Sequence, residues 1–171
     1  MLRLMIALIQ RVTNARVEVA GATVGTIGRG ILALIGIEAG DTPAIGERLL
    51  ERILTYRIFP DPAGRMNLAL GEVDGGLLLV PQFTLVADTS RGTRPGFSHA
   101  ATPDAASGLF EALCAAARTR HDVEGRHRVA TGTFGADMQV SLTNDGPVTF
   151  NLRVAPPTNL NFPGPPDSLV L

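Results

Sequence analysis

The sequence contains no lysine, and this absence excludes several mechanisms at once. All 15 basic residues among the 171 are arginines, so the chain has neither a P-loop lysine nor a Schiff-base lysine. Arginine suits planar, bidentate contact with phosphate better than lysine does. The formal net charge is only -1, so no strong overall field draws the chain to nucleic acid or to a membrane surface. A nucleic-acid partner would have to be contacted locally.

Cysteine and metal-binding patterns are equally sparse. Cys114 is the one cysteine, so no internal disulfide framework can form, and a reducing, cytoplasmic compartment is expected. The three histidines show no metal-ligand spacing, so no metal or other cofactor is expected. Two of them, His121 and His127, are predicted to be solvated loop residues.

Long apolar runs are missing too. No run approaches the roughly 20 residues that would span a bilayer. The apolar start of the chain ends at Gln10 and Arg11 and lacks a basic segment and a small-residue cleavage site. This pattern favours a buried first strand over a signal peptide.

Short apolar runs and period-2 alternation predict that much of the chain forms strands. Buried strands are expected at residues 4–12, 31–37 and 77–80, and a hairpin at residues 17–27. Residues 138–154 alternate on both sides of the sequence Asn-Asp-Gly-Pro, so a long antiparallel hairpin with a stiff turn is expected there.

Two helices are predicted, each opened by a threonine followed by a proline. Thr42 and Thr102 suit the N-cap, and proline fits the first helical position. The second helix is expected to end near Arg120. The fold class is therefore expected to be mixed α/β (α+β), a curved, mostly antiparallel sheet or partial barrel with two main helices. Residues 1–154 are expected to form a single domain, followed by a proline-rich tail, 155–171, that is disordered or extended.

Three features could carry chemistry, but the residues alone favour structural roles for each. "PQFTL", residues 81–85, is typical of a strand with a proline at a kink or edge. "NDGPVTF", residues 144–150, is typical of a rigid turn. Cys114 lies inside the second predicted helix with no histidine near it in the sequence, which favours a small buried hydrophobe over a nucleophile.

Together, the two motifs make the chain resemble the D-aminoacyl-tRNA deacylases, enzymes that hydrolyse D-amino acids mischarged on tRNA. The likeness covers about residues 5–154, through "MIALIQRVTNARVEV", "YRIFPDPAGRMNL", "QFTLVADTSRGTRPGFS" and "GTFGADMQVSLTNDGPVTF". The diagnostic motifs of the family are Ser-Gln-Phe-Thr and Gly-Pro-Val-Thr. The second is intact here, whereas Pro81 replaces the serine of the first. Because proline lacks both the hydroxyl and the N–H, the essential donors are expected at Gln82 or later.

The resemblance implies a homodimer with its active site near the interface. It also implies tRNA as the partner, held by its aminoacylated 3' end, with no membrane and no DNA partner. In this family the Gly-Pro peptide is cis and reaches into the partner's pocket, so Gly146 and Pro147 are expected to form a chiral filter made of main chain. An L side chain would meet their carbonyl oxygens. D-aminoacyl esters would pass, and so would glycyl esters such as glycine mischarged on tRNA-Ala.

For the hydrolysis, the resemblance points to Gln82, Phe83 and Thr84. The N–H groups of Phe83 and Thr84 are expected to stabilise the oxyanion, each by about 3–4 kcal/mol. Gln82 would orient polar groups, and the 2'-OH of the substrate would help to position water. The motif supplies no histidine, lysine or carboxylate that could activate the Thr84 hydroxyl as a nucleophile.

Other interpretations remain open. Arg91 and Arg94 could contact the tRNA acceptor end, or they could belong to a solvated loop with surface ion pairs. The chain could be a non-catalytic nucleic-acid-binding module on the same fold, since a fold does not determine an activity. A thiol esterase built on Cys114 is a third, weaker alternative.

Overall fold

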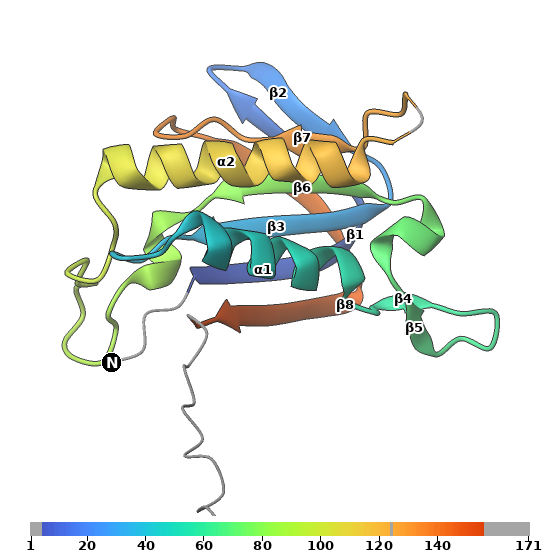
Figure 1. Ribbon diagram of the computed structural model, residues 1–171, viewed down its shortest axis with the longest axis horizontal. Coiled ribbons are helices and arrows are strands. Elements are labelled where there is room, and N and C mark those ends of the chain that lie inside the picture. The colour runs from blue at the N-terminus through green and yellow to red at the C-terminus, as the bar shows by residue number, and fades with distance from the viewer. Residues whose placement is uncertain (1–4, 124, 156–171) are drawn as a thin grey trace, which may run out of the picture.

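The structure, a computed structural model, describes residues 5–123 and 125–155 as a curved sheet with two helices on one side (Figure 1). The six-stranded sheet has the order β2-β1-β3-β6-β7, with β8 paired to β1, and β4 and β5 form a separate small sheet. The expected α+β class is confirmed. In chain order the elements are β1 (Met5–Val19), β2 (Ala22–Ile27), β3 (Gly30–Gly36), α1 (Pro43–Thr55), β4 (Phe59–Pro60), β5 (Met66–Leu68), η1 (Leu70–Val73), β6 (Gly76–Pro81), η2 (Phe83–Val86), α2 (Pro103–His121), β7 (Val129–Thr131) and β8 (Gln139–Val154).

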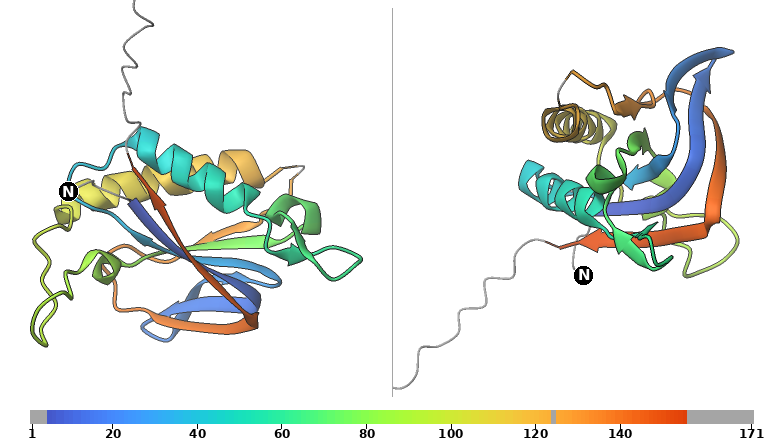
Figure 2. Two further views of the ribbon diagram at one scale, coloured as in Figure 1. Left: turned by 90° about the horizontal axis from the view of Figure 1, so that it is seen from below. Right: turned by 90° about the vertical axis from the view of Figure 1, so that its right-hand side faces the viewer.

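Both helices lie on the same face of the sheet because of how β3, β6 and β7 are connected. These three strands are parallel, and a parallel pair needs a crossover, which here contains α1 or α2. The two crossovers step in the same direction across the sheet. Since such connections are right-handed, both helices are brought to one face, as Figure 2 shows.

The helix boundaries follow the predicted caps. Both helices begin at the expected prolines, and the Thr42 side chain accepts a hydrogen bond from the Ile45 N–H at 3.4 Å. Thr102 precedes α2 without a side-chain cap bond. α2 ends at His121, one residue beyond the expected end.

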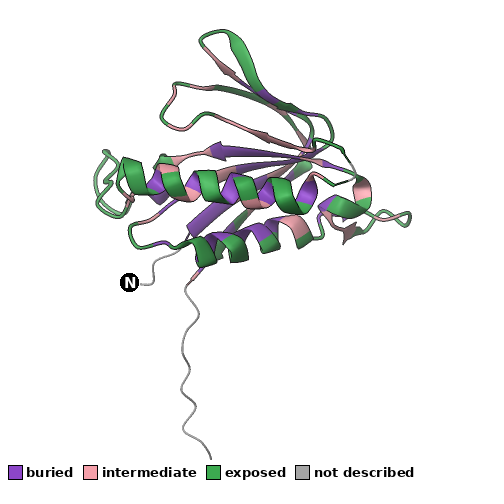
Figure 3. Cartoon of the chain, turned by 45° about the horizontal axis from the view of Figure 1, so that its top comes forward, coloured by how far each residue is buried: buried purple, intermediate pink, exposed green. Residues whose placement is uncertain are grey.

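The hydrophobic core lies mainly between the helices and the sheet. Leu49 and Leu50 of α1 and Phe110 of α2 pack there against Ile31 and Ala33 of β3. A second, smaller cluster occupies the other side of the sheet, where the sheet curls over itself. Its buried members are Val12, Ala15, Val17, Ile27, Leu32, Leu78 and Val80. Strands covered on both faces read as continuous apolar runs, which explains the sequence of β3 and β6. Figure 3 shows the buried strands behind the helices.

β1 and β8 are the two long strands, and they correct the predicted hairpin at residues 138–154. β8 is one strand of 16 residues that pairs antiparallel with β1 along almost its whole length. Gln10 pairs with Thr149 and Val12 with Asn144, so Arg11 alone lies opposite residues 145–148. The segment Asn-Asp-Gly-Pro is therefore a bulge inside a strand, and it does not reverse the chain. Alternation on both sides of a bulge reads like a hairpin because the inward-facing positions continue beyond it.

The free edges of β2 and β7 face each other and almost close the sheet into a barrel. They are the end strands of the sheet path, and no ladder joins them within the described residues. The carbonyl oxygen of Thr131 lies only 2.6 Å from where a Cβ on Gly25 would stand. Glycine at this position lets the two backbones approach closely. We call the two facing edges the seam.

The two histidines near the end of α2 have different environments. His121 is 5% exposed, and its Nε2 lies 2.8 Å from the carbonyl oxygen of Gly75. The prediction that it is solvated is wrong, because the helix extends far enough to turn this side chain into the protein. His127 has a side chain that is 92% exposed, and for it the prediction is confirmed. Most of the predicted tail lies outside the described residues.

Candidate functional site

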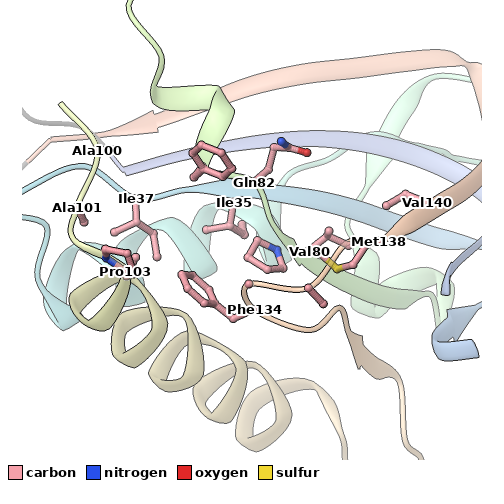
Figure 4. A pocket seen from close by; sticks show the side chains of 15 residues that line it. Ile35, Ile37, Val80, Gln82, Ala100, Ala101, Pro103, Phe134, Met138 and Val140 are labelled. Carbon is pink, nitrogen blue, oxygen red and sulfur yellow. The ribbon is translucent and has the colours of Figure 1, made fainter. Parts of the chain in front are cut away.

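A cavity of about 480 Å³ opens at the ends of β3 and β6, beside the first turns of α2 (Figure 4). None of its lining residues carries a charge. Its walls are apolar apart from backbone groups and Gln82. A cavity of this kind accepts a small, largely uncharged group and orients it by a few polar contacts. The lining residues are Ile35, Ile37, Val80, Pro81, Gln82, Phe83, Ala100, Ala101, Pro103, Ala106, Phe134, Gly135, Ala136, Met138 and Val140.

Pro81 ends β6 at the wall of this cavity without disturbing the sheet. The Leu77 N–H donates to Arg128 beside β7, and the Gln82 N–H donates to Ile35 of β3 at 2.7 Å. Successive N–H groups in a strand point to opposite neighbours, so the Pro81 nitrogen faces the side of β7. The β6–β7 ladder has already ended at the pair Leu79 and Thr131. A proline here therefore costs no ladder hydrogen bond.

The residues after Pro81 turn into the short 3-10 helix η2 and leave two backbone donors unused. Within the described residues, the N–H groups of Phe83 and Thr84 have no hydrogen-bond acceptor, whereas the Gln82 N–H is engaged with Ile35. Phe83 and Thr84 are both exposed. Two adjacent free N–H groups at the edge of an apolar cavity can stabilise a developing oxyanion.

The side chains of Gln82 and Thr84 bind each other. The Gln82 Nε2 donates to the Thr84 Oγ1. No histidine or carboxylate in the described part of the chain is hydrogen-bonded to this hydroxyl. A threonine nucleophile needs a base within hydrogen-bond reach, and the geometry supplies an amide instead.

Arg91 and Arg94 lie on an exposed loop beside the cavity. Asp88 and Gly96 close the base of this loop through two backbone hydrogen bonds of 2.7 and 3.0 Å. Hydrogen bonds from the Ser90 side chain and backbone hold the pKa of Asp88 below its ordinary value. Neither arginine forms an ion pair within the described ranges.

The rings of Phe83 and Phe97 lie together at the mouth of the cavity. Their centroids are 5.2 Å apart, and the two residues are 63% and 39% exposed. Large aromatic surfaces are usually buried in a monomeric protein, so an exposed pair indicates a contact with a ligand or another chain.

Gly146 and Pro147 lie at the bulge of β8 and do not line the cavity of their own chain. The peptide between them is cis, and both residues are exposed. Gly146 has a φ of +125°, and a Cβ there would stand 2.7 Å from the Val148 Cγ2. Only glycine fits this position without strain. The structure thus separates the two predicted motifs within one chain.

Arg11 supports the bulge from inside the protein. Its side chain is only 12% exposed. Its Nε donates to the Asp145 carbonyl at 3.2 Å and lies 3.0 Å from the Asp145 Oδ2. Its Nη1 donates to the Ile58 carbonyl at 2.7 Å. On the other side, the Asn144 Oδ1 accepts the Val148 N–H at 3.2 Å.

Sequence reasoning missed Arg11, although a charge at the end of the apolar run that opens β1 was a usable signal. It also gave no role to Phe134, Met138 or Val140, which line the cavity. Period-2 alternation marked Met138 and Val140 as strand positions but did not show that they face a cavity, and Phe134 lies in a loop without periodicity. Only the folded chain brings them beside β6.

Cys114 is a core residue. It is 5% exposed, and burial raises the pKa of its thiol to about 11. The thiol is therefore protonated at neutral pH, as the interpretation as a buried hydrophobe requires. No group of three or more possible metal ligands occurs within the described residues. No helix in that part of the chain is long and apolar enough to cross a membrane.

Comparison with known proteins adds an independent finding. Residues 8–153 match the sequence model of the family described as D-Tyr-tRNA(Tyr) deacylase. A protein named D-aminoacyl-tRNA deacylase from Methylococcus capsulatus is 60% identical over 152 residues, which cover 89% of this chain and 96% of that protein. Its namesake from Nitrosococcus oceani is 57% identical over 152 residues, covering 89% and 95%.

Solved structures agree on the fold. The c-Myc DNA Unwinding Element Binding Protein superposes with a TM-score of 0.80 at 36% identity, covering 86% of this chain and 97% of that one. A probable eukaryotic D-amino acid tRNA deacylase superposes with a TM-score of 0.76 at 20% identity, covering 88% and 99%. The family match and the identities to the bacterial proteins span nearly all of the described residues. The chain therefore belongs to the D-Tyr-tRNA(Tyr) deacylase family of enzymes.

Proposed function

We propose that the protein hydrolyses the ester bond between a D-amino acid and the 3' end of tRNA, releasing the free D-amino acid and tRNA. The observation that carries this proposal is the pair of adjacent free N–H groups of Phe83, which lines the uncharged cavity, and of Thr84, the residue that follows it. Attack by water on the ester carbonyl generates a negative oxygen, and two backbone donors can bind that oxygen. Membership of the deacylase family supports the substrate class.

In this mechanism the protein contributes position and hydrogen bonds, and it supplies no general base. The lining residues of the cavity include no titratable side chain. Gln82 fixes the Thr84 hydroxyl, and the 2'-OH of the terminal ribose is the group left to position the attacking water. Such placement of reactants together with oxyanion stabilisation accounts for large rate effects without covalent catalysis.

Selection against L-aminoacyl esters is assigned to Gly146 and Pro147 of a second subunit in a homodimer. Two observations support this. Both residues are exposed, and the cavity of the same chain does not contain them. Arg11 and Asn144 hold the bulge from behind, so its backbone is rigid enough to exclude an L side chain. A backbone filter leaves room for hydrogen, so glycyl-tRNA, including glycine mischarged on tRNA-Ala, is a further substrate.

The tRNA is the proposed partner, and Arg91 and Arg94 are proposed contacts with its acceptor end. They lie on the exposed loop beside the cavity mouth, and their guanidinium groups suit phosphate. The site of action is the cytoplasm, because charged tRNA is used there.

The direct test is to incubate the protein with D-Tyr-tRNA, L-Tyr-tRNA and Gly-tRNA and to follow release of the amino acid. Cleavage of the D and glycyl esters with L-Tyr-tRNA left intact is expected. No cleavage of any ester would instead favour a non-catalytic RNA-binding module. The oligomeric state is checked by light scattering, with twice the 18.0 kDa chain mass expected.

Thr84→Ala tests the role assigned to the side chain. We expect deacylation to fall less than about tenfold, because the N–H at that position remains. Thr89→Ala, in the exposed loop that follows, is the matched control. Complete loss of activity in a folded Thr84→Ala protein that still binds tRNA would overturn the backbone mechanism.

A further inference from the structure

A second cleft, of about 380 Å³, lies at the seam and shares no lining residue with the first cavity. It is bounded by β2, by the last turns of α2, and by β7 with the residues that lead into it. Its polar lining has three hydroxyl groups and three side chains that can carry positive charge: Thr23, Thr26, Thr131, Arg118, His127 and Arg128. No lining residue is acidic.

The acids near the cleft are already engaged. Asp74 pairs with Arg128 and, at 2.7 Å, with Arg126. The Asp122 Oδ1 accepts the N–H groups of Arg128 and Val129 at 2.6 and 2.8 Å. Two arginines beside Asp74 leave a net positive charge. The other oxygen of Asp122, Oδ2, lies 3.9 Å from the Nδ1 of His127, so this carboxylate is held by neighbouring protein groups.

Among the positive charges of the cleft, that of Arg118 is the least engaged by protein groups. It is exposed, its Nη2 donates to the Thr131 Oγ1 at 3.5 Å, and it forms no ion pair within the described part of the chain. Edge strands also point alternate N–H groups outward, and both walls of the seam are edge strands. The cleft is thus rich in donors and carries a positive charge, which suits phosphate oxygens.

The same two elements join this cleft to the first cavity. On α2, Ala106 lines the cavity and Arg118 lines the cleft, a separation of about 18 Å at the usual helical rise. The chain that leaves β7 continues directly into Phe134 and Met138 of the cavity wall. One strand of stacked nucleic acid advances about 3.4 Å per nucleotide, so the two sites lie roughly five nucleotides apart.

We propose that the seam cleft binds a backbone phosphate of the substrate RNA, several nucleotides upstream of the 3' end held in the first cavity. This rests on the proposed deacylase function. Arg118 is the principal ligand, the Thr131 hydroxyl that it contacts positions its side chain, and Arg128 adds positive charge to the lining. The contact recognises the backbone, so it raises affinity for tRNA without selecting its sequence.

The test compares a long and a short substrate. D-aminoacyl-tRNA spans both sites, whereas a 3'-D-aminoacyl-adenosine reaches only the cavity. For Arg118→Ala we expect KM for the tRNA substrate to rise about 3- to 10-fold, and for Arg118→Glu we expect a larger rise. In both variants kcat for the tRNA substrate and the kinetics of the short substrate should stay unchanged. The slope of log KM against log salt concentration should fall by about 0.7–1.

Arg48→Ala is the matched control, because it removes the same charge from an exposed helical arginine outside both sites. It should leave the salt slope unchanged. If the wild type cleaves both substrates and Arg118→Glu keeps its KM and slope for tRNA, the cleft assignment is wrong. If the wild type cleaves neither substrate, the proposed deacylase function is wrong. The cleft is then tested on its own, by comparing how the binding of uncharged tRNA to the wild type and to Arg118→Glu depends on salt concentration.

A binding experiment with inorganic phosphate completes the test of the cleft. Titration with phosphate alone should show weak binding that depends on Arg118, far weaker than tRNA binding. Tight, Arg118-dependent binding of inorganic phosphate together with an unchanged affinity for tRNA would identify a site for a free small anion. That outcome would overturn the assignment to RNA.

Discussion

The first cavity and the seam cleft are built on the same strands and the same helix, yet they differ in almost every chemical respect. The cavity is apolar, with one polar side chain, Gln82, and its proposed chemistry depends on backbone N–H groups. The cleft is lined by arginine, histidine and threonine. An ester carbonyl gains charge only during reaction, so it needs fixed dipoles in a place without mobile charge. A phosphate is always charged, so flexible arginines at the surface suffice.

Two arginines, Arg11 and Arg118, differ from each other in a similar way. Arg11, behind the Gly-Pro bulge, is nearly buried and binds only protein groups. Arg118 is exposed and has one weak protein contact. The first is part of the framework, and the second is available to a ligand.

The largest effect is expected from removing a backbone donor without changing any side chain. Replacing Thr84 by its α-hydroxy acid converts the amide into an ester and deletes the N–H. We expect kcat to fall about 100- to 1,000-fold, equally for the tRNA and the short substrate, in single-turnover assays. The same exchange at Thr89 is the control. An equal loss at both positions would mean that the effect is structural.

Arg11→Ala should weaken both the fold and the filter. It leaves the Ile58 carbonyl and Asp145 without their partner, which should lower the free energy of unfolding by about 1–3 kcal/mol. A loosened bulge should let L-Tyr-tRNA be cleaved measurably while D-Tyr-tRNA is still cleaved. Denaturant unfolding and paired deacylation assays measure the two effects.

The control for Arg11→Ala is Arg16→Ala on the same strand. Arg16 is 56% exposed and pairs with Glu18 at 3.5 Å, so its loss should change stability by about 0–1 kcal/mol. If both variants keep full rejection of the L ester, Arg11 does not hold the filter.

The pH dependence of the rate should reveal the absence of a protein base. Because no titratable side chain lines the cavity, kcat at saturating substrate should show no bell-shaped profile between pH 5.5 and 8 of the kind that an acid–base pair gives. A smooth rise with hydroxide concentration is compatible with the mechanism. A sigmoidal step near the usual pKa of histidine would require a base that the cavity lacks.

The smallest effect on activity is expected for Cys114→Ala, which should keep full deacylation and so exclude a thiol esterase. Its effect is on stability. The folded-state pKa of the thiol is raised by burial from 9.0 to about 11. The unfolded chain therefore loses its proton first, and stability declines as pH rises through this window. The decline should reach about 2–3 kcal/mol and be absent in the alanine variant, as measured by urea unfolding at several pH values.

Local rules predicted much of the fold. The helix starts after Thr42 and Thr102 were recoverable because cap residues and proline act within one turn. The apolar runs of β3 and β6 were recoverable because burial on both faces removes polar positions. These signals depend on neighbours in the sequence.

Features that depend on distant residues were not recoverable in the same way. The bulge at Gly146 looked like a hairpin turn, because nothing in residues 138–154 reports that β1 continues beside both halves. His121 was assigned to solvent, because only the position of Gly75 shows that the end of the helix is covered. The seam cleft needs β2 and β7, far apart in the sequence, to meet at Gly25 and Thr131. The motif residues, in contrast, were found through the family resemblance, and their roles stay predictions.

The continuity of β8 has a consequence for how the specificity of such an enzyme can change over evolutionary time. Because β1 pairs with β8 on both sides of the bulge, the register of the sheet does not depend on what residues 145–148 contain. Substitutions of the exposed Pro147 can therefore reshape the surface of the bulge, whereas Val148 belongs to the core and has to stay apolar. Exposed positions of the bulge can thus vary over evolutionary time with little penalty to the fold, whereas Arg11 and Gly146 couple the shape of the bulge to stability.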